Sequence, residues 1–311
     1  MGNRSTSATS VRMDGLSTVG AFGRHWLPAI DLALVRSLGE EVDASSMLAE
    51  PAGYWFRFKG RRFRPLALLA ACELVGGRPE GAVDAACIIE LIHTSSLILD
   101  DLPCMDDSAE RRGVASLHRV YGDATALLTA LLLLNLAHRR LARLCAARGA
   151  VWHERICELL GNGGMIGGQD IDLRLARGDS LPAGIDGAGV RLRKTTSLTV
   201  AALELGAFLG GAPPSQVDAL GAFGAALGRL VQAMDDLVDG DRQPANGRHA
   251  WSPDAILSER RRATMLLHDA FPGNRPARRV LEGLVQFVVE QSTAPVAMLH
   301  RDPVPSARPG P

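Results

Sequence analysis

Two clusters of aspartates have the chemistry to bind divalent metal ions. The first is Asp100-Asp101-Leu102-Pro103-Cys104-Met105-Asp106, and the second is Asp235-Asp236-Leu237-Val238-Asp239. In the second cluster the outer carboxylates are four residues apart, which places them one turn apart on one helix face. In the first cluster Asp100 and Asp106 are six apart, and we expect Pro103 to break the helix so that Asp106 swings back beside Asp100.

Carboxylates crowded at the ends of apolar helices suit hard cations such as Mg²⁺, which prefer oxygen ligands and fill the remaining positions with water and substrate phosphate. Two facing clusters could hold a diphosphate through several metal ions, which would stabilise it as a leaving group. For either cluster taken singly, a solvated acidic helix end is the alternative.

Basic residues near predicted helix ends supply the direct partners that a metal-bound diphosphate needs. Arg61-Arg62-Phe63-Arg64 precedes one helix, Arg111-Arg112 follows the first cluster by five residues, and Lys194-Thr195-Thr196 opens another helix. Arginine forks match phosphate oxygens bidentately, whereas lysine acts as a point charge. Any one of these groups alone is an ordinary surface charge, so the prediction of an anion site rests on their combination.

The elements that must position these groups are predicted to be helices. Apolar residues recur at helical spacing after Arg64-Pro65, before Asp100, and in two later stretches near residues 203–209 and 227–234. Strict two-residue alternation is scarce, so we predict an all-α fold. The Ser-, Thr- and Gly-rich residues 1–25 are predicted to form a flexible N-terminal arm, residues 26–301 the helical domain, and the proline-rich residues 302–311 a flexible tail.

Composition excludes several classes of protein. The chain has 311 residues, 47% of them hydrophobic, which is ample for a core, and its 34 basic residues equal its 34 acidic ones. A net charge of zero gives no global field for nucleic acid or an anionic membrane, so we predict no nucleic-acid partner. The run Ala124 to Ala137 is interrupted by polar residues and is shorter than the roughly 20 residues of a membrane span, so we predict a buried helix and no membrane span.

The cysteines predict a reduced, cytoplasmic chain. There are five, scattered through the sequence, and we find no Cys-x-x-Cys pair and no nearby histidine at the spacing of a zinc ligand. Residues 1–20 also lack the apolar core of a secretory signal.

Several motifs, in this order, resemble those of the trans-prenyl diphosphate synthases, the family of farnesyl and geranylgeranyl diphosphate synthases. The resemblance runs from about Gly60 to Asp239, and Pro103-Cys104 is similar to an insertion in bacterial farnesyl and in plant or bacterial geranylgeranyl synthases. The motifs that carry it are Gly60-Arg61-Arg62-Phe63-Arg64-Pro65, Glu90-Leu91-Ile92-His93, Asp100 to Gly113, Gly167-Gly168-Gln169-Asp170, Lys194-Thr195 and Gln232-x-x-Asp235-Asp236.

The resemblance implies an isoprenoid synthase-type helical bundle around a central cavity, usually a homodimer, that condenses isopentenyl diphosphate with allylic diphosphates. It implies ionisation of the allylic diphosphate to a carbocation, attack by the isopentenyl double bond, and proton loss, with no covalent nucleophile. By carry-over, Mg²⁺ is bound by Asp100, Asp106, Asp235 and Asp239, with support from Asp101 and Asp236. Isopentenyl diphosphate is bound by Arg61, Arg64, His93 and Arg112. The allylic diphosphate is bound by Arg111, Lys194, Thr195 and Gln232.

The chain departs from the family pattern in three places. A family lysine is Arg61 here, a frequent histidine is Leu99, and the lysines expected after the second cluster are missing, although Arg248 or Arg260 could substitute for them. A lone histidine on an apolar stripe, such as His93, is usually a hydrogen-bonded core residue, but the motif favours a ligand contact.

The residues one turn before Asp100 should line the pocket for the growing chain. Ser95 and Ser96 are both small, and in the family a bulky residue near Ser95 stops elongation at fifteen carbons. We therefore predict a twenty-carbon product, geranylgeranyl diphosphate, and expect Ser95→Phe to shorten it. Two alternatives remain open: a terpene cyclase on the same fold, which would not need a second diphosphate site, and a non-catalytic partner subunit of another synthase.

Overall fold

The computed structural model describes residues 5–58, 60–111, 113–148, 150–185, 187–240, 251–273 and 275–291, with no side-chain description at 5–15, 147–148, 187–188, 191, 236–240 and 291. Its helices are α1 (Ser5–Glu41), α2 (Ala49–Tyr54), α3 (Phe63–Leu74), α4 (Val83–Asp100), α5 (Leu117–Tyr121), α6 (Asp123–Arg148), α7 (Val151–Leu160), α8 (Met165–Ala176), α9 (Gly187–Leu209), α10 (Pro214–Gly240), α11 (Pro253–Ala270) and α12 (Pro276–Gln291). Two 3₁₀ turns, Trp55–Arg57 and Pro79–Ala82, and an antiparallel pair of two-residue strands, β1 (Glu110–Arg111) and β2 (Val114–Ala115), complete the described elements.

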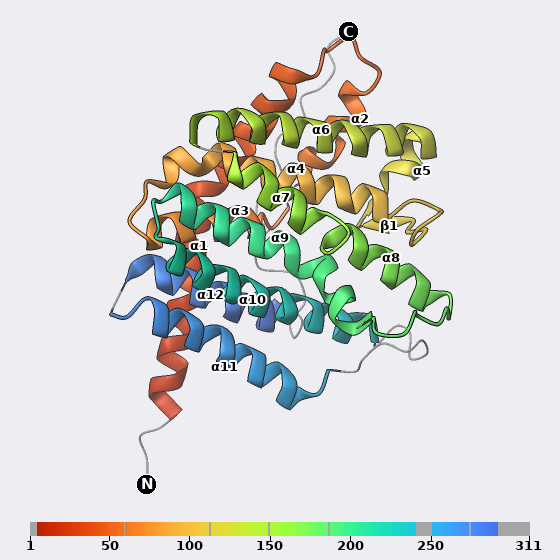
Figure 1. The fold of residues 1–311 in the computed structure, drawn as a ribbon. Coiled ribbons are helices and arrows are strands. Elements are labelled where there is room, and N and C mark those ends of the chain that lie inside the picture. The colour runs from red at the N-terminus through yellow and green to blue at the C-terminus, as the bar shows by residue number, and fades with distance from the viewer. Residues whose placement is uncertain are drawn as a thin grey trace.

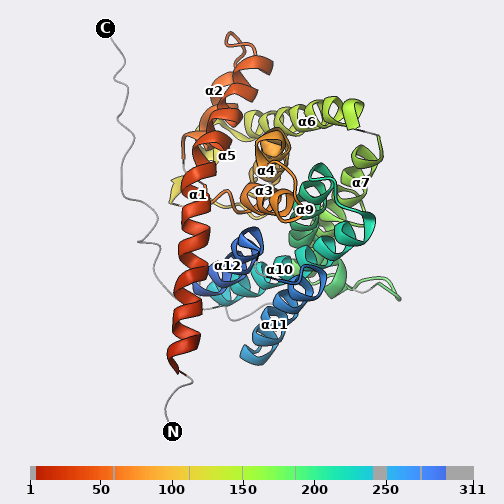
Figure 2. The ribbon, with the colours of Figure 1, turned by 90° about the vertical axis from the view of Figure 1, so that its left-hand side faces the viewer.

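The fold is a helical bundle with α3, α4 and α9 at its centre (Figure 1). α4 packs between α6 and α3, while α9 packs against α3, α8 and α10. Seen from the side, α1 runs along one flank of the bundle, and α12 lies beside it (Figure 2). The prediction of an all-α fold is confirmed.

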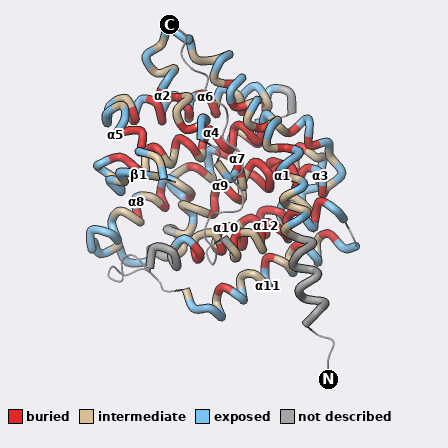
Figure 3. Tube along the Cα trace, turned by 180° about the vertical axis from the view of Figure 1, so that it is seen from behind, coloured by how far each residue is buried: buried red, intermediate tan, exposed pale blue. Residues whose placement is uncertain are grey.

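The central helices carry the core because their apolar residues are not confined to one stripe. In α4 the side chains of Ile88, Ile89, Leu91 and Ile92 are all essentially inaccessible to solvent. A helix that is apolar on every side must be covered on every side. Figure 3 shows this pattern, with buried segments at the centre and exposed ones at the loops and outer helix faces.

Within the part of the chain described, the segment 79–100 is long and apolar enough to cross a membrane, but 67% of its most apolar window is buried inside the fold. This is the behaviour of a core helix. The most apolar described helix is thus α4. The run Ala124 to Ala137, predicted to be a buried helix, lies in α6 and is buried on one face and exposed on the other.

The boundary predicted at residue 26, between an N-terminal arm and the helical domain, falls inside a helix. Residues 5–25 belong to α1, and Phe22, Trp26 and Ile30 of that helix pack on the core. Small polar residues have only modestly lower helix propensity, so packing of the later turns can extend a helix through them. The predicted tail at 302–311 lies outside the described residues.

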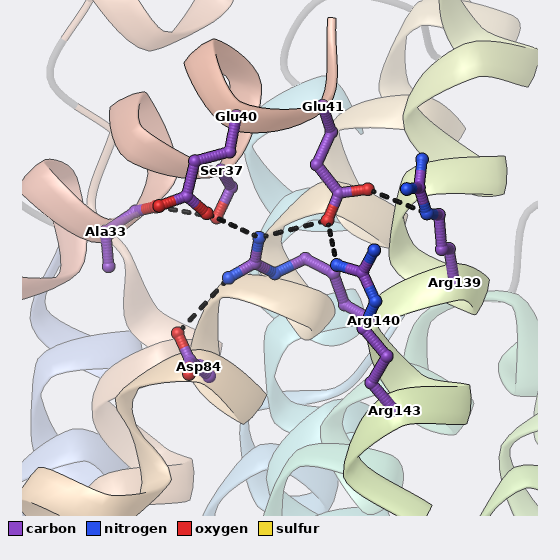
Figure 4. A network of polar contacts seen from close by, with 8 residues as sticks. All are labelled: Ala33, Ser37, Glu40, Glu41, Asp84, Arg139, Arg140 and Arg143. Atoms are coloured by element: carbon purple, nitrogen blue, oxygen red, sulfur yellow. Dashed lines mark hydrogen bonds and ion pairs between the residues drawn. The ribbon is translucent and has the colours of Figure 1, made fainter.

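A buried carboxylate joins the end of α1 to α6. The side chain of Glu41 is only 2% exposed, and it forms ion pairs with Arg139 at 3.2 Å, Arg140 at 3.4 Å and Arg143 at 2.8 Å. Arg140 also reaches Asp84 of α4 at 3.3 Å (Figure 4). Three helices are therefore tied together at one end of the bundle.

Candidate active site

The first aspartate cluster lies where α4 ends. The helix stops at Asp100, as the proline three residues later requires, and the loop turns back so that the backbone N–H of Asp106 donates to the backbone oxygen of Asp100 at 2.9 Å. The expected return of Asp106 toward Asp100 is confirmed for the backbone. Asp106 is exposed, whereas Asp100 is largely enclosed.

Asp100 shares a lysine with a second carboxylate. Lys194 of α9 places its Nζ 3.7 Å from Asp100 Oδ2 and 3.2 Å from Asp172 Oδ2 of α8. Burial, opposed by the attraction of Lys194 and assisted by the nearby charge of Asp106, raises the pKa of Asp100 to about 6. The protein therefore holds this carboxylate where its negative charge is poorly solvated, which a cation would relieve.

Asp101 anchors the guanidinium of Arg111. Both Nε and Nη2 of Arg111, on β1, lie 2.7 Å from Asp101 Oδ1, and the carboxylate is fully buried. Burial raises the pKa of Asp101, and the hydrogen bond from Arg111 opposes that change. Asp101 thus orients Arg111, whose guanidinium carries three further N–H donors.

The second aspartate cluster lies on α10, as its helical spacing predicted. Thr195, next to Lys194 on α9, donates to Gln232 Oε1 at 2.5 Å, and Gln232 precedes Asp235 by one helical turn. Adjacent α9 residues therefore contact the first cluster and the helix that carries the second. Asp235 is exposed, and the side chains of Asp236 and Asp239 lie outside those described.

Two glycines allow the neighbouring helices to approach α9 at these residues. A Cβ at Gly168 of α8 would lie 2.5 Å from the backbone nitrogen of Lys194, and one at Gly228 of α10 would lie 2.7 Å from Cα of Thr196. Both distances are well below van der Waals contact, so no larger residue fits without moving backbone. The glycines set the helix spacing that brings Lys194 and Thr195 to their partners.

A second polar group lies two turns down α4. Arg64 Nη1, in the first turn of α3, is 3.2 Å from His93 Nε2, and because a guanidinium only donates, the ring nitrogen accepts. Arg64 and His93 are thus brought together, and Arg61 is exposed nearby in sequence. Arg112, assigned to the same diphosphate, lies outside the described residues.

Arg62, between these arginines, has a structural role. It takes the left-handed conformation with φ of 45° and is buried, with Nη1 2.7 Å from Glu90 Oε1 and Nε 2.9 Å from Asp31 Oδ1. The glutamate of the Glu-x-x-His motif therefore pairs with Arg62, while the histidine contacts Arg64.

The two serines before Asp100 point in different directions. The hydroxyl of Ser95 donates to the backbone oxygen of Ala130 on α6 at 2.8 Å, and the side chain is buried there. Ser96 is half-buried, and its hydroxyl donates to His93 O on its own helix at 2.9 Å. Ser96 is four residues before Asp100 and shares its face, whereas Ser95 faces α6.

The donor set around Asp100 fits an oxygen-seeking cation. Two oxygens there, Asp101 Oδ2 and Gln169 Oε1, are buried with no hydrogen-bond partner within the described ranges. Among the described residues, the four carboxylates of Asp100, Asp101, Asp106 and Asp172 lie near the basic groups of Lys194, Arg111 and His118. This excess of negative charge and of unpaired acceptors is chemistry that a divalent cation would satisfy.

Sequence reasoning missed Asp172 and drew attention to Asp170 instead. Asp170 is exposed and pairs with Arg174 along its own helix at 2.9 Å. The signal for Asp172 was present: it lies four residues after Gly168, on the face that packs against α9. Of the two suggested substitutes for the late lysines, Arg248 lies outside the described residues, and Arg260 is half-buried on α11.

Comparison with known proteins places these features in context. Residues 45–292 match the family model described as polyprenyl synthetase. Geranylgeranyl pyrophosphate synthase 7, chloroplastic, of Arabidopsis thaliana is 38% identical over 65% of this chain and 61% of its own length, so the chain spans about three-fifths of that relative. Geranylgeranyl pyrophosphate synthase 3, chloroplastic, of the same plant is 35% identical, covering 76% of each chain. A solved structure of an FPP/GFPP synthase from Zymomonas mobilis superposes with a TM-score of 0.70 at 28% identity, covering 89% of this chain and 99% of that one.

Proposed function

Because the chain belongs to the polyprenyl synthetase family, we propose that it is a transferase that condenses isopentenyl diphosphate with an allylic diphosphate to form a longer trans-prenyl diphosphate. The observation that carries the proposal is the position of α9, where Lys194 contacts Asp100 and the next residue, Thr195, contacts Gln232. One helix thereby links the two acidic segments that such a reaction needs around its leaving group.

The family uses a divalent metal, and we propose Mg²⁺ at this site. Asp100 and Asp106 from the loop after α4, with Asp235 and Asp239 from α10, are the proposed ligands. When bound, the ions offset the charge that develops on the departing diphosphate. Asp101 keeps Arg111 oriented toward the same region through its 2.7 Å contacts.

The proposed division of the remaining residues follows their placement. Lys194 and Arg111 contact the first aspartate cluster, and Thr195 contacts Gln232 on the helix that carries the second. These four would bind the allylic diphosphate, with the lysine contributing charge and the others directional hydrogen bonds. The pair Arg64 and His93 lies two turns down α4 and, with Arg61 and Arg112, would bind isopentenyl diphosphate. No side chain acts as a covalent nucleophile, because the double bond of the second substrate attacks the carbocation.

We propose geranylgeranyl diphosphate as the product, on the small size of Ser95 and Ser96. Since Ser96 shares the face of Asp100, a bulky side chain there would obstruct a chain growing down that face. Ser96→Phe should shorten the product, and Ser95→Phe, which must displace α6 at Ala130, tests whether the pocket extends between α4 and α6. An unchanged product profile in both variants would place the floor of the pocket elsewhere.

We also propose a homodimer formed through α6. Leu127, Leu128 and Leu131 on this helix are 42%, 52% and 50% exposed, and they form an apolar stripe on the outer face of α6. Light scattering should give twice the chain mass, and Leu128→Lys should shift the equilibrium toward monomer.

The five free cysteines support a reducing compartment such as the cytoplasm, which fractionation would test.

The decisive experiment uses the purified chain with Mg²⁺, isopentenyl diphosphate and each allylic diphosphate in turn. Elongation that stops on chelation is the expected result, and Lys194→Met should lower kcat/KM by about 100-fold or more, the scale of losing a group that stabilises developing charge. The neighbouring exposed Arg193→Met is the matched control. No elongation with any allylic substrate would favour a partner subunit, and a hydrocarbon formed without isopentenyl diphosphate would favour a cyclase.

A further inference from the structure

Two histidines and a cysteine meet between α6 and α7, away from the residues assigned above. The ligand atoms of His138, His153 and Cys157 all lie within 4.8 Å of one another. The imidazole rings of His138 and His153 have centroids 5.5 Å apart with an interplanar angle of 67°. The two rings therefore approach each other edge-on without stacking, while a nitrogen of each ring lies within 4.8 Å of Cys157 Sγ.

The spacing along α7 is that of a helical metal-ligand pair. His153 and Cys157 are four residues apart, so they lie one turn apart on the same face. This corrects the sequence analysis, which found no histidine at zinc-ligand spacing beside any cysteine: His153 occupies such a position relative to Cys157. The third member, His138, is fifteen residues before His153 in sequence, and only the packing of α6 on α7 brings it into the group.

The packing of α7 holds the site in place. Trp152 and Ile156 of α7 are buried, and the Trp152 ring packs at a tilt of 33° against Phe208 of α9, with ring centroids 4.9 Å apart. Because Trp152 and Ile156 face the core, His153 and Cys157 lie on a less buried face of α7. His138 and His153 are half-buried and Cys157 is exposed, so an ion has a path from solvent.

We propose that His138, His153 and Cys157 bind a borderline transition-metal ion, Zn²⁺ in particular, with water as the fourth ligand. Two imidazole nitrogens and a thiolate are ligands for Zn²⁺ and poor ones for Mg²⁺, so this site and the aspartate clusters select different metals. With Zn–N of about 2.0–2.1 Å and Zn–S of about 2.3 Å, tetrahedral ligand atoms lie about 3.3–3.6 Å apart. The present spacing closes to that distance with movements of about 1 Å, within the reach of side-chain rotation.

The ion would crosslink α6 to α7 across their short connection. α7 leads through Gly161 and Gly164 into α8, the helix that carries Asp172 beside Lys194. Metal binding would therefore restrain a segment that leads directly to the acidic site. The proposal concerns metal binding, so its outcome is independent of the proposed prenyl transfer.

The test uses the untagged, metal-stripped protein in excess Mg²⁺, which occupies oxygen-ligand sites, and a Co²⁺ titration. We expect one equivalent of Co²⁺ to give a thiolate-to-cobalt charge-transfer band and the intense visible bands of tetrahedral coordination, and Zn²⁺ to displace it. Zn²⁺ should also protect Cys157 from alkylation, measured on the isolated peptide by mass spectrometry.

Variants locate the ligands. Cys157→Ser should abolish the charge-transfer band, and His138→Ala or His153→Ala should weaken Co²⁺ binding by about 100-fold or more, since even outer-shell partners are worth about 10- to 100-fold. Cys104→Ser, at the other exposed cysteine, is the matched control and should keep the band. The proposal is overturned if the wild type shows no thiolate band and no protection, or if Cys157→Ser binds as tightly as the wild type. Circular dichroism of each variant checks that it is folded.

Discussion

Replacing Asp100 with asparagine should stabilise the metal-free protein while removing a proposed metal ligand. Burial raises the pKa of this carboxyl from 3.8 to about 6. Between about pH 4 and 6 the folded chain therefore holds a proton that the unfolded chain has released, so stability falls as pH rises through this window. Above it, the folded protein carries a buried charge that the unfolded chain solvates fully.

The magnitude follows from the two pKa values. Their separation, at about 1.4 kcal/mol per pH unit, corresponds to about 3 kcal/mol above pH 7, and to about half of that at pH 5. Asparagine keeps the shape and loses the charge. Lys194 retains Asp172 at 3.2 Å, so the loss of its 3.7 Å contact with Asp100 should subtract little.

Urea unfolding in chelator at pH 5 and pH 7.5 measures the difference. The free energy of unfolding of Asp100→Asn should exceed that of the wild type by up to about 3 kcal/mol at pH 7.5 and by less at pH 5. Asp106→Asn removes another proposed ligand, but this residue is exposed, so its change should stay within about 0.5 kcal/mol. A destabilised Asp100→Asn, or a gain independent of pH, would refute the view that the site is under electrostatic stress.

Three further substitutions test the surrounding structure. Glu41→Gln should lower the free energy of unfolding by about 1–3 kcal/mol, because three arginines lose a buried negative charge and one of its two acceptor oxygens. Exposed Glu40→Gln should change it by less than about 0.5 kcal/mol. Gly168→Ala should destabilise the protein by about 1–3 kcal/mol and lower its activity, because the added Cβ would meet the backbone of α9. Gly163→Ala, where the added Cβ enters open space, should do neither, and equal effects in the two variants would contradict this account. Arg62→Met should lower stability by about 3–5 kcal/mol, since its buried carboxylate partner is left unpaired, and a stable but inactive variant would instead indicate a ligand contact.

The local chemistry of the site was predictable where it depended on spacing along one element. Pro103 ends α4 and allows Asp106 to return, and the four-residue interval from Asp235 to Asp239 lies on α10 as expected. The helix toward which a given side chain points was harder to predict from the sequence. Ser95 and Ser96 looked equivalent in sequence, yet Ser95 contacts α6 through Ala130, whereas Ser96 lies on the same face of α4 as Asp100.

The errors have a common physical origin. Asp172 and His138 each meet partners on other helices, so an interval along one helix, such as that from Gly168 to Asp172, can indicate a face but not the partner that the face meets. The helical character of residues 5–25 was missed because their own propensity is weak, and the turns that follow them are held by the core.

By itself, the sequence determined the helical class, the two acidic segments and the order of motifs that identifies the family, because each is written in residue type and short-range spacing. Tertiary structure decided which charges meet: that Lys194 lies between Asp100 and Asp172, that Arg62 is buried while Arg64 meets His93, and that two histidines and a cysteine converge. Lys194 meets its partners because Gly168 and Gly228 let α8 and α10 approach α9 closely, whereas the other contacts depend on the packing of α3 on α4 and of α6 on α7.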